Sequence, residues 1–239
     1  MRLRLAAIIG TCLFLAGCAS QPVIPFDKTT AGNIKTIAIV TPNMPEKPNV
    51  WLVNDLGKNM GLIGALVDAG LESAREDKFW KDIDGAKNPP RAIFNTALTD
   101  ALTAAGFTVK VIDVKRSSDF LKTYPATDGV DAYLDLTFMG MGYGYLAADM
   151  ADATPYRPFA YVNCRLVRAS DKAVLMQDTV VYNFVSPSGA STTTGVTISP
   201  DPAYNFVDFA ALHANAPKAT EGLRETLKKV AQSVANLIQ

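Results

Sequence analysis

The C-terminal 25 residues carry the pattern that most constrains the fold of this chain. Their large apolar residues recur at steps of four and three, as on one face of an α-helix: Leu223, Leu227, Val230, Val234 and Leu237. The opposite face of this helix is polar. A helix of this kind needs a flat apolar surface beneath it and solvent above it, and a β-sheet provides that surface. The sequence therefore predicts helices packed on a sheet.

The preceding segments alternate between strand and helix patterns. Strand–helix–strand connections favour parallel neighbours with a right-handed crossover, and a later hairpin about Ser170-Asp171 adds antiparallel strands. We therefore expect a mixed α/β (α+β) fold: one mixed sheet of about five strands, with helices packed on it, in a single domain over 34–239. The expected elements are strands at 34–41, 107–114, 130–145, 159–168 and 173–184, and helices at 56–77, 88–105, 117–124, 206–214 and 215–239.

Several residues mark where these elements start and stop. Asn88 can cap the helix that follows it, and Gly106 can end that helix. Three prolines between Pro42 and Pro48 argue against regular structure there. The Ser/Thr/Gly/Pro-rich stretch 186–202 is interpreted as a mobile loop.

The N-terminus has the features of an export signal. Arg2 and Arg4 precede an apolar run of 13 residues from Leu5 to Gly17, which is shorter than the roughly 20 residues of a membrane-spanning helix. Such a run is typical of a secretory signal, and it ends in small residues just before Cys18.

The segment Leu15-Ala16-Gly17-Cys18 resembles the lipobox of bacterial lipoproteins. The resemblance implies that residues 1–17 are removed as a signal peptide and that Cys18 carries acyl chains on its sulfur and its new amine. Residues 18–33 would then be a lipidated tether, rich in polar residues and proline. An ordinary signal peptide with a chance cysteine is the alternative.

This resemblance also predicts where the protein resides. Two or more acyl chains hold a protein stably on a bilayer, so Cys18 makes the membrane a partner. Ala19 and Ser20 follow Cys18 in place of the aspartate that resembles an inner-membrane retention signal. We therefore expect a bacterial outer-membrane protein that faces the periplasm.

The charged and cysteine residues exclude several classes of protein. The chain has 239 residues, with 23 basic and 23 acidic side chains and one histidine, so it lacks the basic surface of a nucleic-acid-binding protein. Of its three cysteines, Cys12 leaves with the signal and Cys18 is blocked by lipid. Only Cys164 remains, which leaves no disulfide framework. We expect no metal and no cofactor.

A stripe of small residues distinguishes the helix predicted at 56–77. Glycine costs a helix about 0.5 to 1 kcal/mol relative to alanine, so its repetition on one stripe suggests close packing. One interpretation is packing on the protein's own sheet or on a neighbouring helix, and the other is an oligomer or bilayer contact. The stripe recurs every fourth residue: Gly57, Gly61, Ala65, Ala69 and Ser73.

The strand predicted at 130–145 is unusual because glycine alternates with larger residues. On strict alternation one face carries Thr137, Met139, Met141, Tyr143 and Tyr145, and the other carries Phe138 and three glycines. Glycines on one face of a strand indicate a close approach by another element or a bulge. Two interpretations of the aromatic residues stay open: a hairpin packed in its own core, or an interaction surface formed by Tyr143, Tyr145, Tyr156 and Phe159.

The sequence gives only weak signals for combinations of residues that could perform catalysis. Gly140 to Gly144 lacks the spacing and the βαβ context of a dinucleotide loop. Cys164 with His213 could form a nucleophile and base, but Cys164 lies on an apolar strand face. Asp149 and Asp152 could form a carboxylate pair for glycan cleavage. We expect no catalytic residue and no enzymatic activity.

By architecture, the chain resembles the small α/β domain of envelope lipoproteins such as the curli-secretion channel subunit and the penicillin-binding-protein activators. Besides Cys18 and the C-terminal helix, the shared segments are Ile37–Val40, Ala104–Phe107, Asp131–Leu134 and the hairpin Cys164–Val167 to Val174–Met176. The resemblance implies a non-enzymatic assembly or partner-binding subunit, with an envelope protein or a second copy as partner. Two alternatives are a subunit of a secretion or export pore and a cell-wall-acting enzyme.

Overall fold

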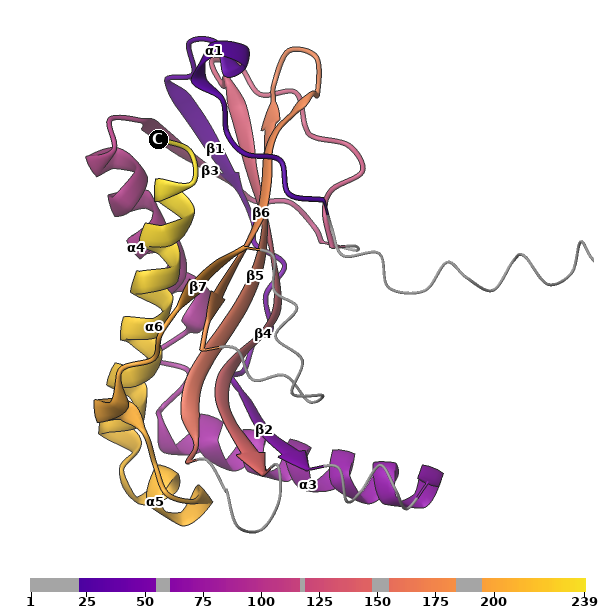
Figure 1. The fold of residues 1–239 in the computed structure, drawn as a ribbon, viewed down its shortest axis with the longest axis vertical. Helices are drawn as coiled ribbons and strands as arrows, with labels where there is room; N and C mark the ends of the chain where they lie inside the picture. Colours follow the sequence, from indigo (N-terminus) through magenta and orange to yellow (C-terminus); the bar gives the residue numbers. More distant parts are fainter. Residues whose placement is uncertain (1–21, 55–60, 117–118, 148–154, 184–194) are drawn as a thin grey trace, which may run out of the picture.

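The computed structural model describes residues 22–54, 61–116, 119–147, 155–183 and 195–239. They form one mixed sheet with helices packed on it, which confirms the predicted fold class (Figure 1). Within these residues the sheet has seven strands, in the order β3-β1-β4-β5-β6-β7, with β2 paired to β4 beside this path. The prediction of about five strands missed the two short strands β2 and β7.

The elements have the following bounds. The helices are α1 (Lys28–Ala31), α3 (Gly61–Asp82), α4 (Pro90–Ala104), α5 (Phe209–Ala214) and α6 (Ala216–Asn236), with a 3-10 turn η1 (Pro202–Tyr204). The strands are β1 (Thr36–Val40), β2 (Asn49–Asn54), β3 (Thr108–Ile112), β4 (Ala132–Ala147), β5 (Arg157–Arg168), β6 (Val174–Tyr182) and β7 (Val196–Ile198).

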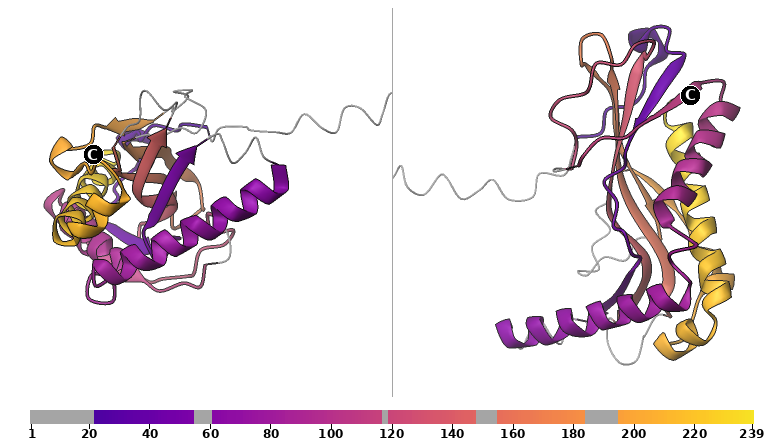
Figure 2. Two further views of the ribbon diagram at one scale, coloured as in Figure 1. Left: turned by 90° about the horizontal axis from the view of Figure 1, so that it is seen from below. Right: turned by 180° about the vertical axis from the view of Figure 1, so that it is seen from behind.

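Helices α4 and α6 lie side by side and cover one face of the sheet (Figures 1 and 2). The predicted apolar stripe of α6 faces the strands, because Leu223, Leu227, Val230 and Val234 are all buried. Helix α4 ends where the sequence predicts: Gly106 has φ +92° and the Phe107 amide donates to the Leu102 carbonyl at 3.1 Å.

The long strand β4 connects most of the sheet. Strands β1 and β2 pair in succession with one edge of β4, both parallel, and β5 pairs antiparallel with the other edge. A bulge lies between Phe138 and Gly140, and Met139 is 50% exposed there. The side chains that enter the helix-covered core therefore change from Leu136 and Phe138 to Met141 and Tyr143. The predicted two-face alternation is wrong beyond this bulge.

Glycine lets β2 approach β4 closely. Gly142 has φ +147°, and a Cβ atom there would lie 2.0 Å from the Asn49 carbonyl oxygen. At Gly140 a Cβ atom would meet the Trp51 ring at 2.5 Å. The alternating glycines thus accommodate a neighbouring strand of the same sheet.

Three local predictions are wrong. Residues 119–124 form no helix, because the backbone and side chains of this segment instead bind Asp135 on β4. Asn88 does not cap α4; its side-chain amide donates to the Ile83 carbonyl at 2.8 Å, just after α3. The described part of 186–202 contains β7, which extends the sheet, and the start of η1.

The predicted tether 18–33 is held on the domain from Pro22 onward. Ile24 forms an antiparallel bridge with Gln177 on β6, and Asp27 caps the short helix α1. Cys18 and the predicted signal peptide, residues 1–17, lie outside the described residues.

The close approach at Gly142 predicts a large loss of stability in the variant Gly142→Ala. An added Cβ meets backbone and also strains a left-handed conformation, so the free energy of unfolding should fall by at least about 2 kcal/mol. The control is Gly70→Ala on α3, where a Cβ meets nothing within 4 Å. Its stability should stay equal or rise slightly. Equal urea midpoints for both variants would contradict the β2–β4 geometry.

Candidate functional site

The sheet face opposite α4 and α6 carries two rows of polar side chains. Strand registry places Asp135, Arg165 and Gln177 side by side on β4, β5 and β6. The next row, two residues along each strand, consists of Thr137, Asn163 and Thr179. Five of these six side chains belong to buried residues, and Arg165 is partly exposed. We call this set the polar rows.

Asp135 is the centre of the polar rows. One carboxylate oxygen accepts from Arg116 at 2.6 Å, and the other accepts from the Leu121 amide at 2.7 Å and the Tyr124 hydroxyl at 2.9 Å. Burial, and then the Asp135 carboxylate, raise the pKa of Tyr124, which keeps its hydroxyl neutral and able to donate. A fully buried carboxylate is thereby satisfied from three directions.

The polar rows also hold the N-terminal segment. The backbone of Gln177 exchanges two hydrogen bonds with Ile24, at 2.7 and 2.8 Å, and its side-chain amide donates to the Pro22 carbonyl at 3.0 Å. The Gln177 side chain also accepts from Arg165 at 2.9 Å. The segment after β3 therefore lies over this face of the sheet, and the segment before β1 runs along the β6 edge beside it.

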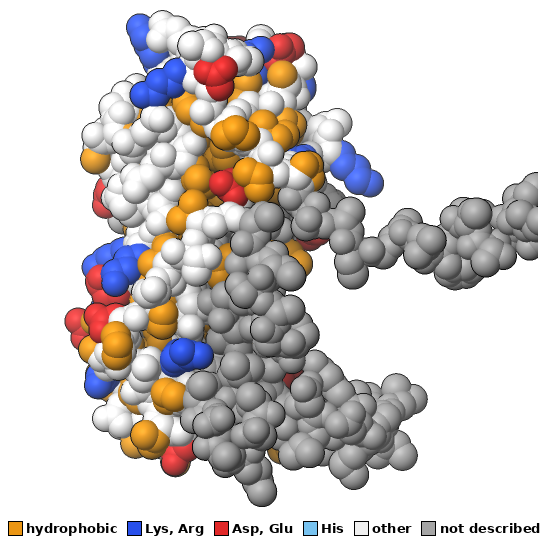
Figure 3. Space-filling model, viewed as in Figure 1, with side chains coloured by type: hydrophobic (Ala, Val, Ile, Leu, Met, Phe, Trp, Pro, Cys, Tyr) orange, Lys and Arg blue, Asp and Glu red, His pale blue; other side chains and the backbone are white. Residues whose placement is uncertain are grey.

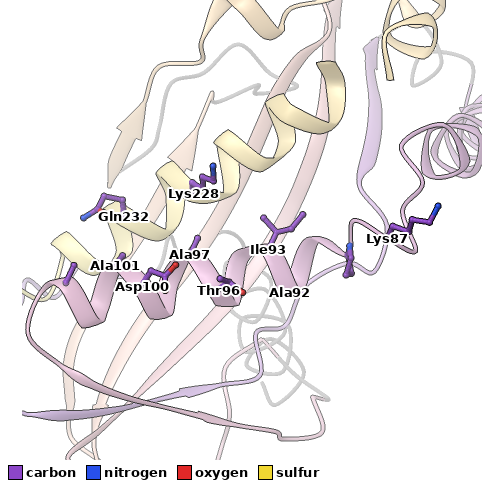
Figure 4. Close-up of a pocket in the computed structure, with 11 residues that line it drawn as sticks. Lys87, Ala92, Ile93, Thr96, Ala97, Asp100, Ala101, Lys228 and Gln232 are labelled. Atoms are coloured by element: carbon purple, nitrogen blue, oxygen red, sulfur yellow. The ribbon is translucent and has the colours of Figure 1, made fainter. Parts of the chain in front are cut away.

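A groove of about 800 Å³ lies on the other side of the molecule, along α4 and α6 (Figure 4). We call it the α4–α6 groove. Its floor contains small or branched apolar residues, among them Ile93, Ala97 and Ala101, and Lys228 and Gln232 project from α6. The remaining lining residues are Lys87, Pro89, Ala92, Thr96, Asp100 and Ala104. The sequence did not predict this groove, because its two walls are 130 residues apart along the chain.

The aromatic residues proposed as an interaction surface lie in the core where the structure describes them. Tyr143, Tyr156 and Phe159 are each at most 3% exposed, so the prediction of an exposed surface is wrong for these three. The Tyr143 hydroxyl donates to the Ala219 carbonyl of α6 at 3.0 Å, and the Phe159 ring stacks on Trp51 at 4.5 Å between centroids. They join β4 and β5 to their neighbours.

The small-residue stripe lies on α3, which extends away from the rest of the molecule in both views of Figure 2. Gly61, Ala65 and Ala69 are part of this helix, whereas Gly57 lies outside the described residues. Tyr145 is paired with Leu52 in the β2–β4 ladder. An interaction role for these five residues stays a prediction.

Two residues considered for catalysis have separate partners. Cys164 is buried under the helices, and burial raises the pKa of its thiol. His213 on α5 forms an ion pair with Asp82 and lies 2.8 Å from the Lys78 ammonium. The structure does not bring Cys164 and His213 into hydrogen-bond contact, while Asp149 and Asp152 lie outside the described residues.

Potential metal-ligating side chains are dispersed over the residues that the structure describes. Within them, no three His, Cys, Asp or Glu side chains gather as a possible metal site. On the face seen in Figure 3, acidic and basic side chains are interspersed with hydrophobic ones. None of the helices in this part of the chain has both the length and the apolar character needed to cross a membrane.

Comparisons with known proteins give only distant structural likenesses. No protein-family model and no curated protein matches the chain. Protein XCC0632 of Xanthomonas campestris, from the DUF330 family, shares 10% identity at a TM-score of 0.40, over 85% of each chain. Lipoprotein GNA1162 of Neisseria meningitidis shares 15% at a TM-score of 0.30, over 62% of this chain and 81% of that one.

A third solved structure, the PelC dodecamer of Paraburkholderia phytofirmans, shares 11% identity at a TM-score of 0.26, over 89% of this chain and 95% of that one. Likenesses at these scores carry no conclusion about function. The resemblance to the curli-secretion and penicillin-binding-protein activator lipoproteins therefore stays a prediction.

The Asp135 network predicts a strong effect of the variant Asp135→Asn. It removes the charge that pairs with the largely buried Arg116 guanidinium, so the free energy of unfolding should fall by about 3 kcal/mol or more. The matched control is Asp171→Asn, which breaks the exposed pair with Arg168 and should cost far less stability. Chemical denaturation measures both; similar losses would contradict a structural role for Asp135.

The position of Cys164 predicts its reactivity. Because its thiol is buried and has a raised pKa, a maleimide should label Cys164 at least a hundred times more slowly in the folded protein than in urea. Mass spectrometry of the chain carrying Cys12→Ala and Cys18→Ala follows this single thiol. Rapid labelling of the folded protein would mean that Cys164 is accessible, and would reopen its role as a nucleophile.

Proposed function

We propose that this protein is a lipid-anchored, periplasm-facing lipoprotein of the bacterial outer membrane that binds another envelope protein and catalyses no reaction. The observation that carries this proposal is the short spacing between the lipobox and the fold. Cys18 follows Leu15-Ala16-Gly17, and Pro22, only four residues later, is already bound by Gln177. Lipid on Cys18 would hold this domain at the membrane surface.

The α4–α6 groove is the surface that we assign to the partner. A long groove with an apolar floor between two helices suits the apolar face of a third helix. Lys87 and Lys228 line the groove beside Asp100, and each also forms an exposed ion pair, with Asp84 at 2.6 Å and Glu225 at 2.8 Å, which a carboxylate of the partner can replace. The partner segment that best complements this groove is an amphipathic helix bearing carboxylates at its edges.

The lipid anchor is tested by metabolic labelling with a fatty acid in the native bacterial envelope. The wild-type protein should incorporate label and fractionate with outer membranes. The variant Cys18→Ala should lose the label and leave the membrane fraction. Incorporation that survives Cys18→Ala would contradict the lipoprotein assignment.

The groove is tested by photo-crosslinking in intact cells. A photoreactive amino acid at Thr96 or at Gln232, both exposed in the groove, should give the same heteromeric adduct, and one at Lys122 should not. The double variant Lys87→Glu, Lys228→Glu should reduce this adduct at least fivefold, because it reverses the charge that faces the partner.

The control for the charge reversal is Lys115→Glu, Lys122→Glu, which changes two exposed lysines outside the groove and should leave the adduct unchanged. An adduct of twice the chain's own mass would show a second copy in the groove and would contradict the proposed partner. Equal adducts at Thr96, Gln232 and Lys122 would contradict a specific groove.

A further inference from the structure

The N-terminal end of the described chain lies on one particular side of the sheet. Pro22 is bound by the Gln177 side chain, which belongs to the polar rows, so it lies over the face opposite α4 and α6. Pro22 is the fourth residue after Cys18. Since an extended chain advances at most about 3.6 Å per residue, lipid on Cys18 would lie within about 14 Å of Pro22.

The helix layer lies on the far side of the sheet from this attachment point. Helices α4 and α6 lie on that side in both views of Figure 2. A helix packs about 10 Å from a neighbouring layer and is itself about 10 Å across. The outer surface of this layer, which contains the α4–α6 groove, therefore lies about 20 Å farther from the anchor than the polar rows do.

Helix α3 extends in the opposite direction, past the sheet and away from α4 and α6. Contacts at its C-terminal end fix it to the body: Arg75 lies 5.9 Å from the Phe209 ring, and Asp77 pairs with Lys47 at 2.7 Å. The helical segment before Arg75 measures about 21 Å at 1.5 Å per residue. This length exceeds the 14 Å reach of the anchor on the same side.

The sequence of the extending part of α3 is apolar. From Gly61 to Leu71, Asp68 is the single charged residue. Leu71 is 49% exposed, and Gly70, Ser73 and Ala74 are exposed beside it. An apolar helix that projects on the side of a lipid anchor can bury its apolar surface in the interface of a bilayer.

We propose that the bilayer faces the polar-row side of the sheet and contacts the N-terminal half of α3, so that the α4–α6 groove points away from the membrane. This orientation rests on the lipid anchor of the proposed function. It makes α3 a second membrane contact and leaves the groove open to a partner in the periplasm.

Fluorescence quenching by lipid tests the orientation. The lipidated full-length protein is reconstituted into phosphatidylethanolamine/phosphatidylglycerol vesicles that contain nitroxide-labelled lipid. Single fluorophores are placed at three exposed sites by Leu71→Cys, Lys122→Cys or Thr96→Cys. Cys164 is buried and Cys18 would be acylated, so each variant presents one reactive thiol.

The expected result is a gradient of quenching. The label at Leu71 should be quenched at least threefold more than the label at Thr96, and the label at Lys122 should fall between them. Equal quenching at Leu71 and Thr96, or stronger quenching at Thr96, would overturn the orientation. Excimer formation between pyrene labels at Leu71 without quenching would show that α3 pairs with a second copy, and would also overturn it.

Vesicle flotation separates this proposal from the anchor on which it rests. A wild-type protein that fails to float with the vesicles would overturn the lipid anchor itself. A protein that floats, and whose Cys18→Ala variant does not, retains the anchor whatever the quenching pattern. Uniform quenching in that case would overturn the orientation alone.

Discussion

The bulge in β4 is the constraint on which the rest of the structure depends. Before it, Phe138 enters the core and meets Phe94 of α4 with ring centroids 4.8 Å apart. After it, Tyr143 enters the same core and meets Phe79, just before the end of α3, at 5.6 Å. Because the side-chain period of a strand is two, one extra residue is needed for both ends of this long strand to fill the core in this way. Met139 is that residue.

The opposite face of β4 is organised by a buried charge. An unpaired carboxylate at Asp135 would cost several kcal/mol, so its position requires Arg116 and the segment that carries Leu121 and Tyr124. That segment closes over the sheet where a helix was expected. Gln177 and the N-terminal chain complete the same face. The two sides of the sheet thus differ in kind: one is closed by loops and the N-terminal segment, and the other carries helices with a groove.

Elements with a strong local pattern were predictable from sequence. The stripe of α6, the hairpin of β5 and β6, and the end of α4 at Gly106 all follow from the spacing of apolar residues or from one glycine. Features that depend on distant partners were not. The segment at 119–124 was expected to be helical but instead binds Asp135, and β2 follows prolines that argue against a strand. The α4–α6 groove and the pairing of Ile24 with Gln177 each join segments more than a hundred residues apart. No local sequence pattern predicts either contact.

The proposed function connects these two sides of the sheet. An anchor at Cys18 would be joined to a segment that is already hydrogen-bonded to Gln177 on β6. The domain would therefore have a fixed orientation relative to the membrane and would not swing freely on a tether. The most direct measurement is amide hydrogen exchange at Ile24, whose N–H donates to the Gln177 carbonyl at 2.7 Å. We predict exchange at least a hundredfold slower than in an unfolded chain, and faster exchange after Gln177→Pro, which removes the reciprocal donor. Exchange of Ile24 at the unfolded rate in the wild-type protein would mean a free tether, and would contradict the account.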